Sequence, residues 1–203
     1  MKYKGFTLEP RPSNFPDAGT GLFIKGKCKA GQLVSIYPGL IYKPGMPLFF
    51  QSYSNAYIIR RSDGFSVDGK YFGLSKFMFR STALKNNASP DSFVDTTWLS
   101  SLYRMKKAKT PFDHFSNRSP LNLGQMINCG PVEAVQNVTY YEYTLPGDFP
   151  SDLRTYFPNI YYNEDDLSFP DQNFPSGLKT ILLISTRDLQ DEELLSDYNF
   201  IAV

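Results

Sequence analysis

The side chains that usually act as nucleophiles, bases or metal ligands are scarce in this chain of 203 residues. It has one histidine, His114, and two cysteines, Cys28 and Cys129. A structural zinc site needs four ligands, and a hydrolase of the Ser-His-Asp or Cys-His type would have to use His114. That histidine lies in a polar and aromatic segment without a nucleophile elbow. We therefore expect neither a metal site nor a hydrolase of these types.

Three other segments carry glycine, amide and hydroxyl groups in a fixed order. The first, 17–24, holds two glycines separated by one residue (Gly-x-Gly), directly before an apolar strand. The second, 123–131, contains Asn128, and the third, 187–198, runs through an acidic turn to Tyr198. Each segment alone is typical of a turn or a β corner. The glycine pair also lacks the third glycine of a dinucleotide-binding motif.

Taken together and in this order, the three segments resemble the SET domain of protein lysine methyltransferases. That family has a Gly-x-Gly before a strand, an Arg-Phe-Ile-Asn-His-Ser-Cys run, and a Gly-Glu-Glu-Leu-x-x-Asp-Tyr stretch near the domain end. Here the second run reads Gln125-Met126-Ile127-Asn128. The similarity spans about residues 17–200. It is closest to one subgroup of the family, which shares the stretches at 49–52 and 156–160.

The resemblance implies that the chain transfers a methyl group from S-adenosylmethionine to a protein side chain, with the lysine ε-amine as the expected acceptor. Backbone groups around the glycine pair would lie close to the donor, because glycine has no Cβ to block the approach. The residues expected to bind the donor are Gly19, Thr20, Gly21, Leu22, Gln125, Asn128, Cys129 and Tyr198. No metal is required for this chemistry.

The expected catalytic residue is Tyr198, whose hydroxyl would orient the acceptor amine and the methyl group. A lysine with a pKa of ~10.4 must first lose its proton, which costs about 4–5 kcal/mol near pH 7. A dry aromatic channel lowers this cost because burial disfavours the ammonium form. We expect the aromatic-rich C-terminal half to supply an aromatic face, and residues 70–120 to close the channel.

Departures from the family pattern leave an alternative open. Cys129 replaces the family histidine and Gly130 the serine, while Ser196 stands where the family has a Phe or Tyr that helps to set the degree of methylation. The chain also ends at Val203 without the cysteine-rich tail of many relatives. The alternative is a catalytically degenerate SET-fold module for protein interaction. A methyltransferase for an acceptor other than lysine is a third possibility.

The fold that the resemblance implies is mostly β, a β-clip of small curved sheets around a C-terminal pseudoknot. Its threaded topology would bring Asn128 and Tyr198 side by side, although composition could not have predicted this. We expect a single SET domain over residues 1–203, with a core at about 17–200. Two stretches with little periodicity, at about 70–120 and 146–177, are expected to be loop or helix insertions.

The composition also favours a mostly β chain, because 16% aromatic residues accompany 15 prolines and 14 glycines. The predicted strands are 21–25, 32–37, 56–60, 65–68, 138–145 and 180–185. Helices are predicted over 95–107 and 151–157, the second of them capped by Ser151. The Glu192-Glu193 pair is expected to be a solvated turn.

Charge and hydropathy bound the expected partners. There are 21 Lys and Arg residues against 20 Asp and Glu, so the net charge is +1, and direct nucleic-acid binding is not expected. The most apolar run is too short to span a bilayer, and the N-terminus does not resemble a signal peptide. We therefore expect an intracellular protein, nuclear or cytoplasmic, that acts on a lysine-bearing protein and does not bind membranes.

Overall fold

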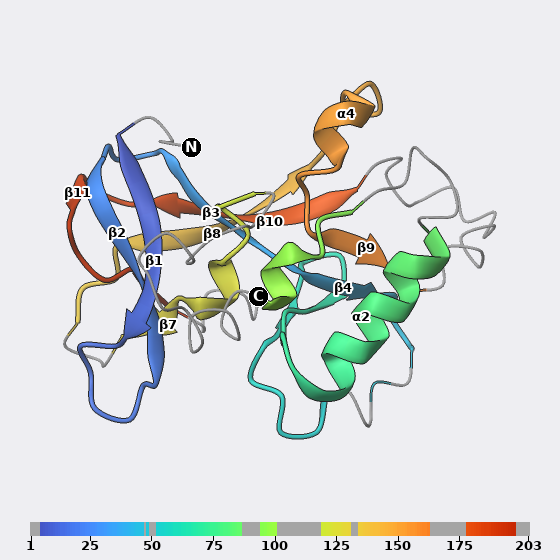
Figure 1. The fold of residues 1–203 in the computed structure, drawn as a ribbon. Helices are drawn as coiled ribbons and strands as arrows, with labels where there is room; N and C mark the ends of the chain where they lie inside the picture. Colours follow the sequence, from blue (N-terminus) through green and yellow to red (C-terminus); the bar gives the residue numbers. More distant parts are fainter. Residues whose placement is uncertain are drawn as a thin grey trace.

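The structure, a computed structural model, is built mainly of short strands arranged in small sheets (Figure 1). It describes residues 5–46, 48, 52–86, 94–100, 119–130, 134–162 and 178–197. Among these residues, no helix is long and apolar enough to cross a membrane. The prediction of a mostly β fold is confirmed.

Two antiparallel sheets of three strands form one half of the molecule. The first has the order β1-β2-β11, with β1 at Phe6–Pro12, β2 at Thr20–Cys28 and β11 at Leu189–Gln190. The second has the order β3-β10-β8, with β3 at Leu33–Tyr37, β10 at Lys179–Ser185 and β8 at Val138–Thr144. Segments from both ends of the sequence therefore meet in each sheet.

The third sheet contains four strands in the order β5-β6-β4-β9. They are β4 at Gly39–Tyr42, β5 at Ile58–Arg60, β6 at Ser66–Asp68 and β9 at Asn159–Tyr161. Helix α2, at Gly73–Asn86, lies beside β4 and β9 (Figure 1). The shorter helical turns are η2 at Thr97–Ser100, η4 at Gly124–Met126 and α4 at Ser151–Arg154.

A fourth pairing is small but decisive for the site. Strand β7, at Asn128–Cys129, pairs in parallel with β12, at Leu195–Ser196, so that Leu195 lies opposite Asn128. This places the second and third sequence segments side by side, as the resemblance implied. Tyr198 itself lies outside the described residues, two positions beyond β12.

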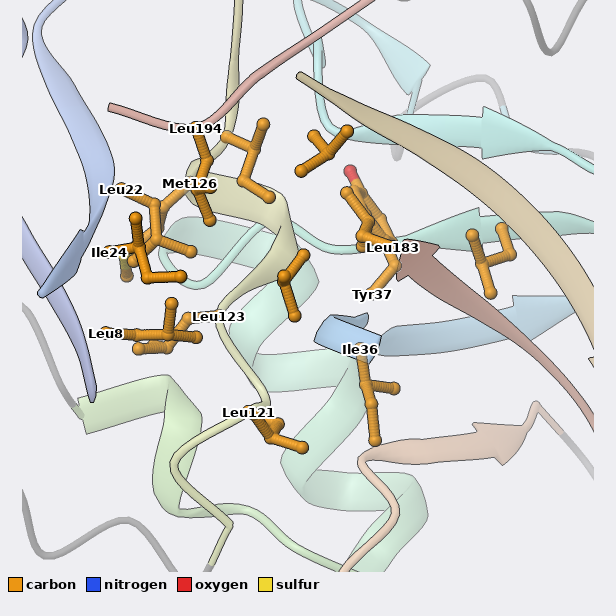
Figure 2. Packing of buried hydrophobic residues seen from close by; sticks show 14 of the residues in the cluster. Leu8, Leu22, Ile24, Ile36, Tyr37, Leu121, Leu123, Met126, Leu183 and Leu194 are labelled. Carbon is orange, nitrogen blue, oxygen red and sulfur yellow. The ribbon is translucent and has the colours of Figure 1, made fainter. Parts of the chain in front are cut away.

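The main core lies among β2, β3, β10 and the turn that precedes η4. Leu22, Leu123 and Leu183 are fully buried there, and Figure 2 shows them among other aliphatic side chains of the same cluster. A second cluster lies under α2, where Phe79 packs edge-on against Trp98 at a centroid distance of 5.1 Å. Both clusters bury residues that alternate along strands or recur along helix faces.

All six predicted strands are present, but the sequence reading missed others. Strand β1 carries two prolines, Pro10 and Pro12, which are tolerated because β1 is an edge strand. Helix α2 falls within the stretch read as lacking periodicity, because it exposes Leu74, Phe77 and Leu84 to solvent as well as burying Phe79. Apolar residues on both faces conceal the helical period.

The two predicted helices are only partly found. Of the helix predicted over 95–107, the described part forms the single turn η2, and 101–118 lies outside the described residues. Helix α4 is shorter than predicted, and its N-cap is Pro150. The prediction that Ser151 caps this helix is therefore wrong, because Ser151 is already its first residue.

Candidate functional site

A cavity of about 950 Å³ lies where the first two segments, 17–24 and 123–131, approach the β5–β6 hairpin. Its wall is formed by residues 18–20, 56–62 and 125–128, together with several tyrosines. Pockets of this size hold drug-sized organic ligands, whose orientation is fixed by a few polar groups. Among the described residues, no group of three or more His, Cys, Asp and Glu side chains is placed to hold a metal ion.

Asn137, the residue directly before β8, anchors the third segment beside β7. Its side-chain oxygen accepts a hydrogen bond from the Leu195 backbone nitrogen at 2.8 Å, and its Nδ2 donates to the Glu193 carbonyl at 2.8 Å. Asn137 is only 1% exposed, so these bonds lie in a medium that strengthens them. The residue fixes the strand pairing beside Asn128 without lining the cavity. The sequence placed Asn137 shortly after the Asn128-Cys129 run, but no structural role was predicted for it.

Asn128 lies on the cavity wall at the meeting point of all three segments. Its Nδ2 lies 3.4 Å from the carbonyl oxygen of Thr20 and 3.4 Å from Oε1 of Glu193. These are long hydrogen bonds, so the amide is held only loosely by the protein. Asn128 is half-buried and faces a space that can hold a ligand.

Glu193 is buried beneath this junction, with an exposed fraction of 4%. Its carboxylate accepts hydrogen bonds from the Ser13 hydroxyl at 2.7 Å and from the Asn14 backbone nitrogen at 2.8 Å. The expectation of a solvated Glu192-Glu193 turn is therefore wrong for Glu193. The sequence could not show this, because the partners lie about 180 positions away.

Glu192 is the more exposed of the two residues, but it is paired as well. It forms an ion pair with Arg187 at 2.5 Å and accepts a hydrogen bond from Asn137 Nδ2 at 3.0 Å. Partial burial raises the pKa of the Glu192 carboxyl, but the Arg187 contact and the hydrogen bonds from Gln190 and Asn137 together outweigh it and leave the pKa below its usual range. Glu192 thus stays ionised and ties the acidic turn to the bend at Arg187.

The buried position of the Glu193 carboxylate requires a glycine at position 21. A Cβ on Gly21 would lie 2.1 Å from Oε1 of Glu193 and 3.2 Å from Nδ2 of Asn128. The absence of a side chain lets the buried carboxylate sit against strand β2. Gly21 and the fully buried Leu22 do not line the cavity, whereas Gly19 and Thr20 do.

Gly21→Ala should therefore lower the free energy of unfolding by about 1–3 kcal/mol, because the new methyl group must displace the Glu193 carboxylate. Chemical denaturation measures the change. Gly147→Ala is the matched control, since no described heavy atom lies within 4 Å of the position of its added Cβ. Equal stability of the two variants would show that Glu193 moves aside without cost.

Gln125 lies on the cavity wall at the turn η4, and it is 4% exposed. The preceding Gly124 lets η4 pack directly on the sheet, because a Cβ there would lie 2.6 Å from Leu183 Cδ1 and 2.9 Å from the Ile36 carbonyl oxygen. The chain before η4 is anchored by the hydrogen bond from the Ile36 backbone nitrogen to the Leu121 carbonyl, at 2.8 Å. The position of Gln125 thus follows from the packing of η4 on β3.

Tyrosines supply the aromatic part of the wall. Tyr37 donates a hydrogen bond to the Tyr57 carbonyl at 2.9 Å, and Tyr140 packs edge-on against Tyr37 at a centroid distance of 6.4 Å. Tyr71 packs edge-on against Tyr57, and burial raises the pKa of its hydroxyl, so it stays protonated. Among the described residues, Tyr140 is the aromatic contribution of the C-terminal half to the wall. Tyr71 is the contribution of the described part of 70–120 to the cavity.

Ser196 is fully buried, and its Oγ lies 3.0 Å from the hydroxyl of Tyr140. The hydroxyl pair connects β12 to a tyrosine of the cavity wall. Cys129, one position beyond Asn128, is exposed and does not line the cavity. Its Sγ has only a weak contact, at 3.6 Å, with the Gly130 carbonyl oxygen.

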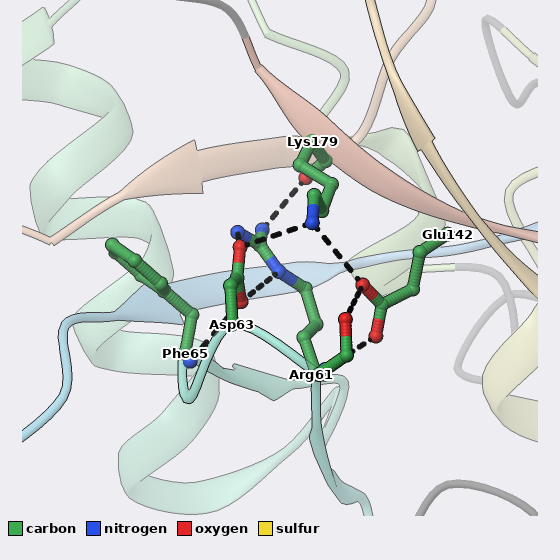
Figure 3. Close-up of polar contacts among 6 residues, drawn as sticks. Arg61, Asp63, Phe65, Glu142 and Lys179 are labelled. Atoms are coloured by element: carbon green, nitrogen blue, oxygen red, sulfur yellow. Dashed lines mark hydrogen bonds and ion pairs between the residues drawn. The ribbon is translucent and has the colours of Figure 1, made fainter. Parts of the chain in front are cut away.

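The hairpin that carries part of the wall is fixed by a cluster of charged groups around Arg61 (Figure 3). The Arg61 guanidinium contacts Asp63 at 2.5 Å and donates to the Lys179 carbonyl at 2.8 Å. Lys179 Nζ lies 3.4 Å from Asp63 and 3.3 Å from Glu142, which accepts hydrogen bonds from Ser62. We call these five residues the Arg61 cluster. It joins the hairpin to β8 and β10.

The structure thus brings four of the residues expected to bind the donor, Gly19, Thr20, Gln125 and Asn128, to one cavity. It places Gly21, Leu22 and Cys129 away from the cavity wall, and Tyr198 lies outside the described residues. That any of these residues binds the donor stays a prediction. The chemistry of the wall suits a polar organic molecule, because it combines the Asn128 amide, backbone carbonyls and tyrosine rings.

Comparison with known proteins finds two curated relatives. The chain is 35% identical over 199 residues to SET domain-containing protein 9 of Homo sapiens and to the protein of the same name of Pongo abelii. The match covers 97% of this chain but 59% and 65% of these relatives, so the chain spans less than two thirds of their length. No protein-family model matches the chain.

Two solved structures resemble it more distantly. One is ctPRC2 in an autoinhibited conformation bound to S-adenosylmethionine, with a TM-score of 0.45, 12% identity, and coverage of 97% of this chain and 16% of that chain. The other is CpSET8 from Cryptosporidium, with a TM-score of 0.46, 11% identity, and coverage of 94% of this chain and 56% of that chain. Because both TM-scores are below 0.5, neither likeness supports a functional assignment.

Proposed function

Since this chain belongs to the SET-domain family, as its relation to SET domain-containing protein 9 shows, we propose that it is an S-adenosylmethionine-dependent methyltransferase that acts on a protein side chain. One observation of the structure carries the proposal. The cavity brings Gly19 and Thr20 within reach of Gln125 and Asn128, although more than 100 positions separate the two segments. These are residues at which the family motifs predict donor binding.

The residues of the cavity fit such a donor. The wall has a loosely held amide on Asn128 and a glycine, Gly19, that leaves the backbone open. Tyrosine faces and carbonyl oxygens favour a cationic sulfonium. When bound, the donor supplies an activated methyl group, and every further requirement falls on the protein.

The protein must hold the acceptor in line and remove its charge. We propose that the acceptor is the ε-amine of a lysine on a protein substrate. Tyr37, Tyr57, Tyr71 and Tyr140 enclose part of the cavity, and such a weakly hydrated wall favours the neutral amine over the ammonium ion. Tyr198 would orient the amine through its hydroxyl. We place the protein itself in the nucleus or the cytoplasm.

A second candidate function is a degenerate SET-fold module that binds a protein without transferring a methyl group. The exposed position of Cys129 favours it, because the side chain that replaces the family histidine contributes nothing to the cavity. The two functions differ in one measurable property, the affinity of the folded chain for the donor or its product.

Calorimetric titration with S-adenosylhomocysteine should show binding in the micromolar range. Asn128→Ala should weaken this binding by about 10- to 100-fold, because a hydrogen bond to a charged group is worth about 1.5–3 kcal/mol. Cys129→Ala is the matched control and should bind as the wild type does, since Cys129 lies outside the cavity. No heat at millimolar ligand, from a chain shown to be folded, would favour the degenerate module.

A further inference from the structure

The charge on the cavity wall has one sign. Among the described residues that line the cavity there is no Asp or Glu, and the charged side chains are those of Arg60 and Arg61. The Arg61 guanidinium is neutralised by its ion pair with Asp63. Arg60 is exposed and forms no ion pair among the residues that the structure describes. The wall therefore carries one positive charge that the protein does not compensate.

Strand β5 directs the side chain of Arg60 away from the core. Side chains alternate along a strand, and Ile59 is buried in the main core cluster. Ile58 and Arg60 therefore lie on the other face of β5, where Arg60 is exposed. Arg60 thus belongs to the hairpin wall of the cavity, whereas the segments expected to bind the donor, 17–24 and 123–131, form other parts of the wall.

The carboxylates carried by this hairpin or bound to it are already engaged. Asp63 and Glu142 belong to the Arg61 cluster. Asp68, at the end of β6, is 2% exposed, accepts a hydrogen bond from Asn55 at 3.0 Å and does not line the cavity. A counter-charge for Arg60 inside the cavity must therefore come from a bound molecule.

A second cation lies beside the tyrosines of the hairpin side. Tyr57 and Tyr71 line the cavity, and both pack edge-on against Phe72, which is 45% exposed. Lys70 Nζ lies 5.1 Å from the centroid of the Phe72 ring, and it is in no ion pair with a described carboxylate. The aromatic and positive surface therefore continues from the hairpin wall to the outside of the cavity.

The proposed reaction would bring more positive charge to this wall. S-adenosylmethionine carries a sulfonium and an ammonium group against one carboxylate, so its net charge is positive. An acidic group on the protein substrate would offset the charges of the donor and of Arg60. A guanidinium is also suited to such a group, because its planar fork matches a carboxylate with two parallel hydrogen bonds.

We infer that Arg60 is a specificity-determining residue, which binds an acidic side chain next to the acceptor lysine of the substrate. The inference rests on the proposed function, and it narrows the substrate class to proteins whose target lysine lies beside Asp or Glu. The carboxylate of the donor has the same chemistry, so the experiment must distinguish it from a carboxylate of the substrate.

Peptide binding to the complex with S-adenosylhomocysteine tests the inference without requiring turnover. Two peptide pools share a central lysine and differ only in having Glu or Gln directly before and after it. In fluorescence polarisation the wild type should bind the Glu pool about 10- to 100-fold more tightly, because the ion pair forms within the cavity. Arg60→Gln should bind the two pools within twofold of each other. Its Tm should change little, since Arg60 is exposed.

Arg80→Gln is the matched control. Arg80 is exposed on helix α2 and does not line the cavity, so this variant removes the same charge from another place on the surface. It should keep the wild-type preference for the Glu pool. An equal loss of preference in both variants would show a general effect of net charge and would overturn the contact with Arg60.

The other contrary outcomes separate the inference from the proposed function. If the wild type binds S-adenosylhomocysteine but does not prefer the Glu pool, or if Arg60→Gln keeps the preference, the inference is wrong and the proposed function stands. If Arg60→Gln binds S-adenosylhomocysteine more weakly but binds 5′-methylthioadenosine, which lacks the amino-acid end, as the wild type does, Arg60 contacts the donor carboxylate and the inference is again wrong. If the folded wild type does not bind S-adenosylhomocysteine, both fall together.

Discussion

Replacing Arg61 with methionine should lower the free energy of unfolding by about 3–5 kcal/mol, the loss typical of a buried ion pair that is deprived of one partner. The Arg61 side chain is 1% exposed and reaches Asp63 with two of its nitrogens and the Lys179 carbonyl with a third. Its removal leaves the carboxylate of Asp63 with the Phe65 backbone nitrogen, at 3.3 Å, and the Lys179 ammonium group, at 3.4 Å. Equilibrium denaturation in urea at pH 7 measures the difference.

The pH dependence of stability provides a second readout of the same variant. Burial raises the pKa of the Asp63 carboxyl, but the hydrogen bond and charge of Arg61, the Phe65 backbone hydrogen bond and the charge of Lys179 together outweigh it and hold the pKa below its usual range. A carboxyl with a lowered folded-state pKa adds stability that is present above its unfolded pKa of ~3.9 and is lost as the pH falls below it. Arg61→Met should reduce this acid-dependent loss.

Lys29→Met is the control for the Arg61 variant. Lys29 pairs with Asp188 at 2.5 Å, but both side chains are largely exposed, so little change is expected. A double variant that removes Asp63 as well should regain part of the lost stability, because no buried charge is then left unpaired. If Arg61→Met is as stable as Lys29→Met, the Arg61 cluster does not hold the hairpin.

The strands were predictable because their local sequence carries the information. Strand β10 contains the apolar run Ile181-Leu182-Leu183-Ile184, which is typical of a strand. Strand β8 is rich in β-branched and aromatic residues, which also favour a strand. Helix α2 was missed for the opposite reason. Its apolar residues cover both the face on the second core cluster and the face toward solvent, so no single period marks it.

The candidate site was predictable only through family motifs. Gly19 and Asn128 were found because their neighbours follow the family pattern, and the structure brings both to one cavity. The buried state of Glu193 was missed, since an acidic pair in a polar segment is ordinarily solvated. Its burial depends on Gly21 and on Ser13, which lies 180 positions away. Such contacts join segments that lie far apart in the sequence, so they leave no local signal.

Gln125 is a second residue whose environment could not be predicted from the sequence, because neither atom of its amide has a hydrogen-bond partner among the described residues. The family motif marked the position, and the replacement of arginine by glutamine could be read directly. That both amide atoms lack a described partner follows only from the packing of η4 on Ile36 and Leu183. The sequence thus located Gln125, whereas the burial of its side chain and the unpaired state of its amide are visible only in the structure.

Tyr198→Phe should reduce methyl transfer by at least about 100-fold, because phenylalanine keeps the ring and removes only the hydroxyl that is proposed to orient the amine and the methyl group. Transfer of a labelled methyl group from S-adenosylmethionine to an array of lysine-bearing peptides measures the rate. The affinity for S-adenosylhomocysteine and Tm should change little, since no charge or apolar surface is lost.

Tyr141→Phe is the matched control for this variant, because Tyr141 is 56% exposed on β8 and does not line the cavity. It should transfer methyl groups at the wild-type rate. Equal rates for Tyr198→Phe and the wild type would remove Tyr198 from the mechanism. A loss of donor affinity together with the rate would make Tyr198 a binding residue instead. Only a lower rate at unchanged affinity assigns the hydroxyl to the transfer step. Losing an interaction that is made only in the transition state lowers the rate but does not weaken ground-state binding.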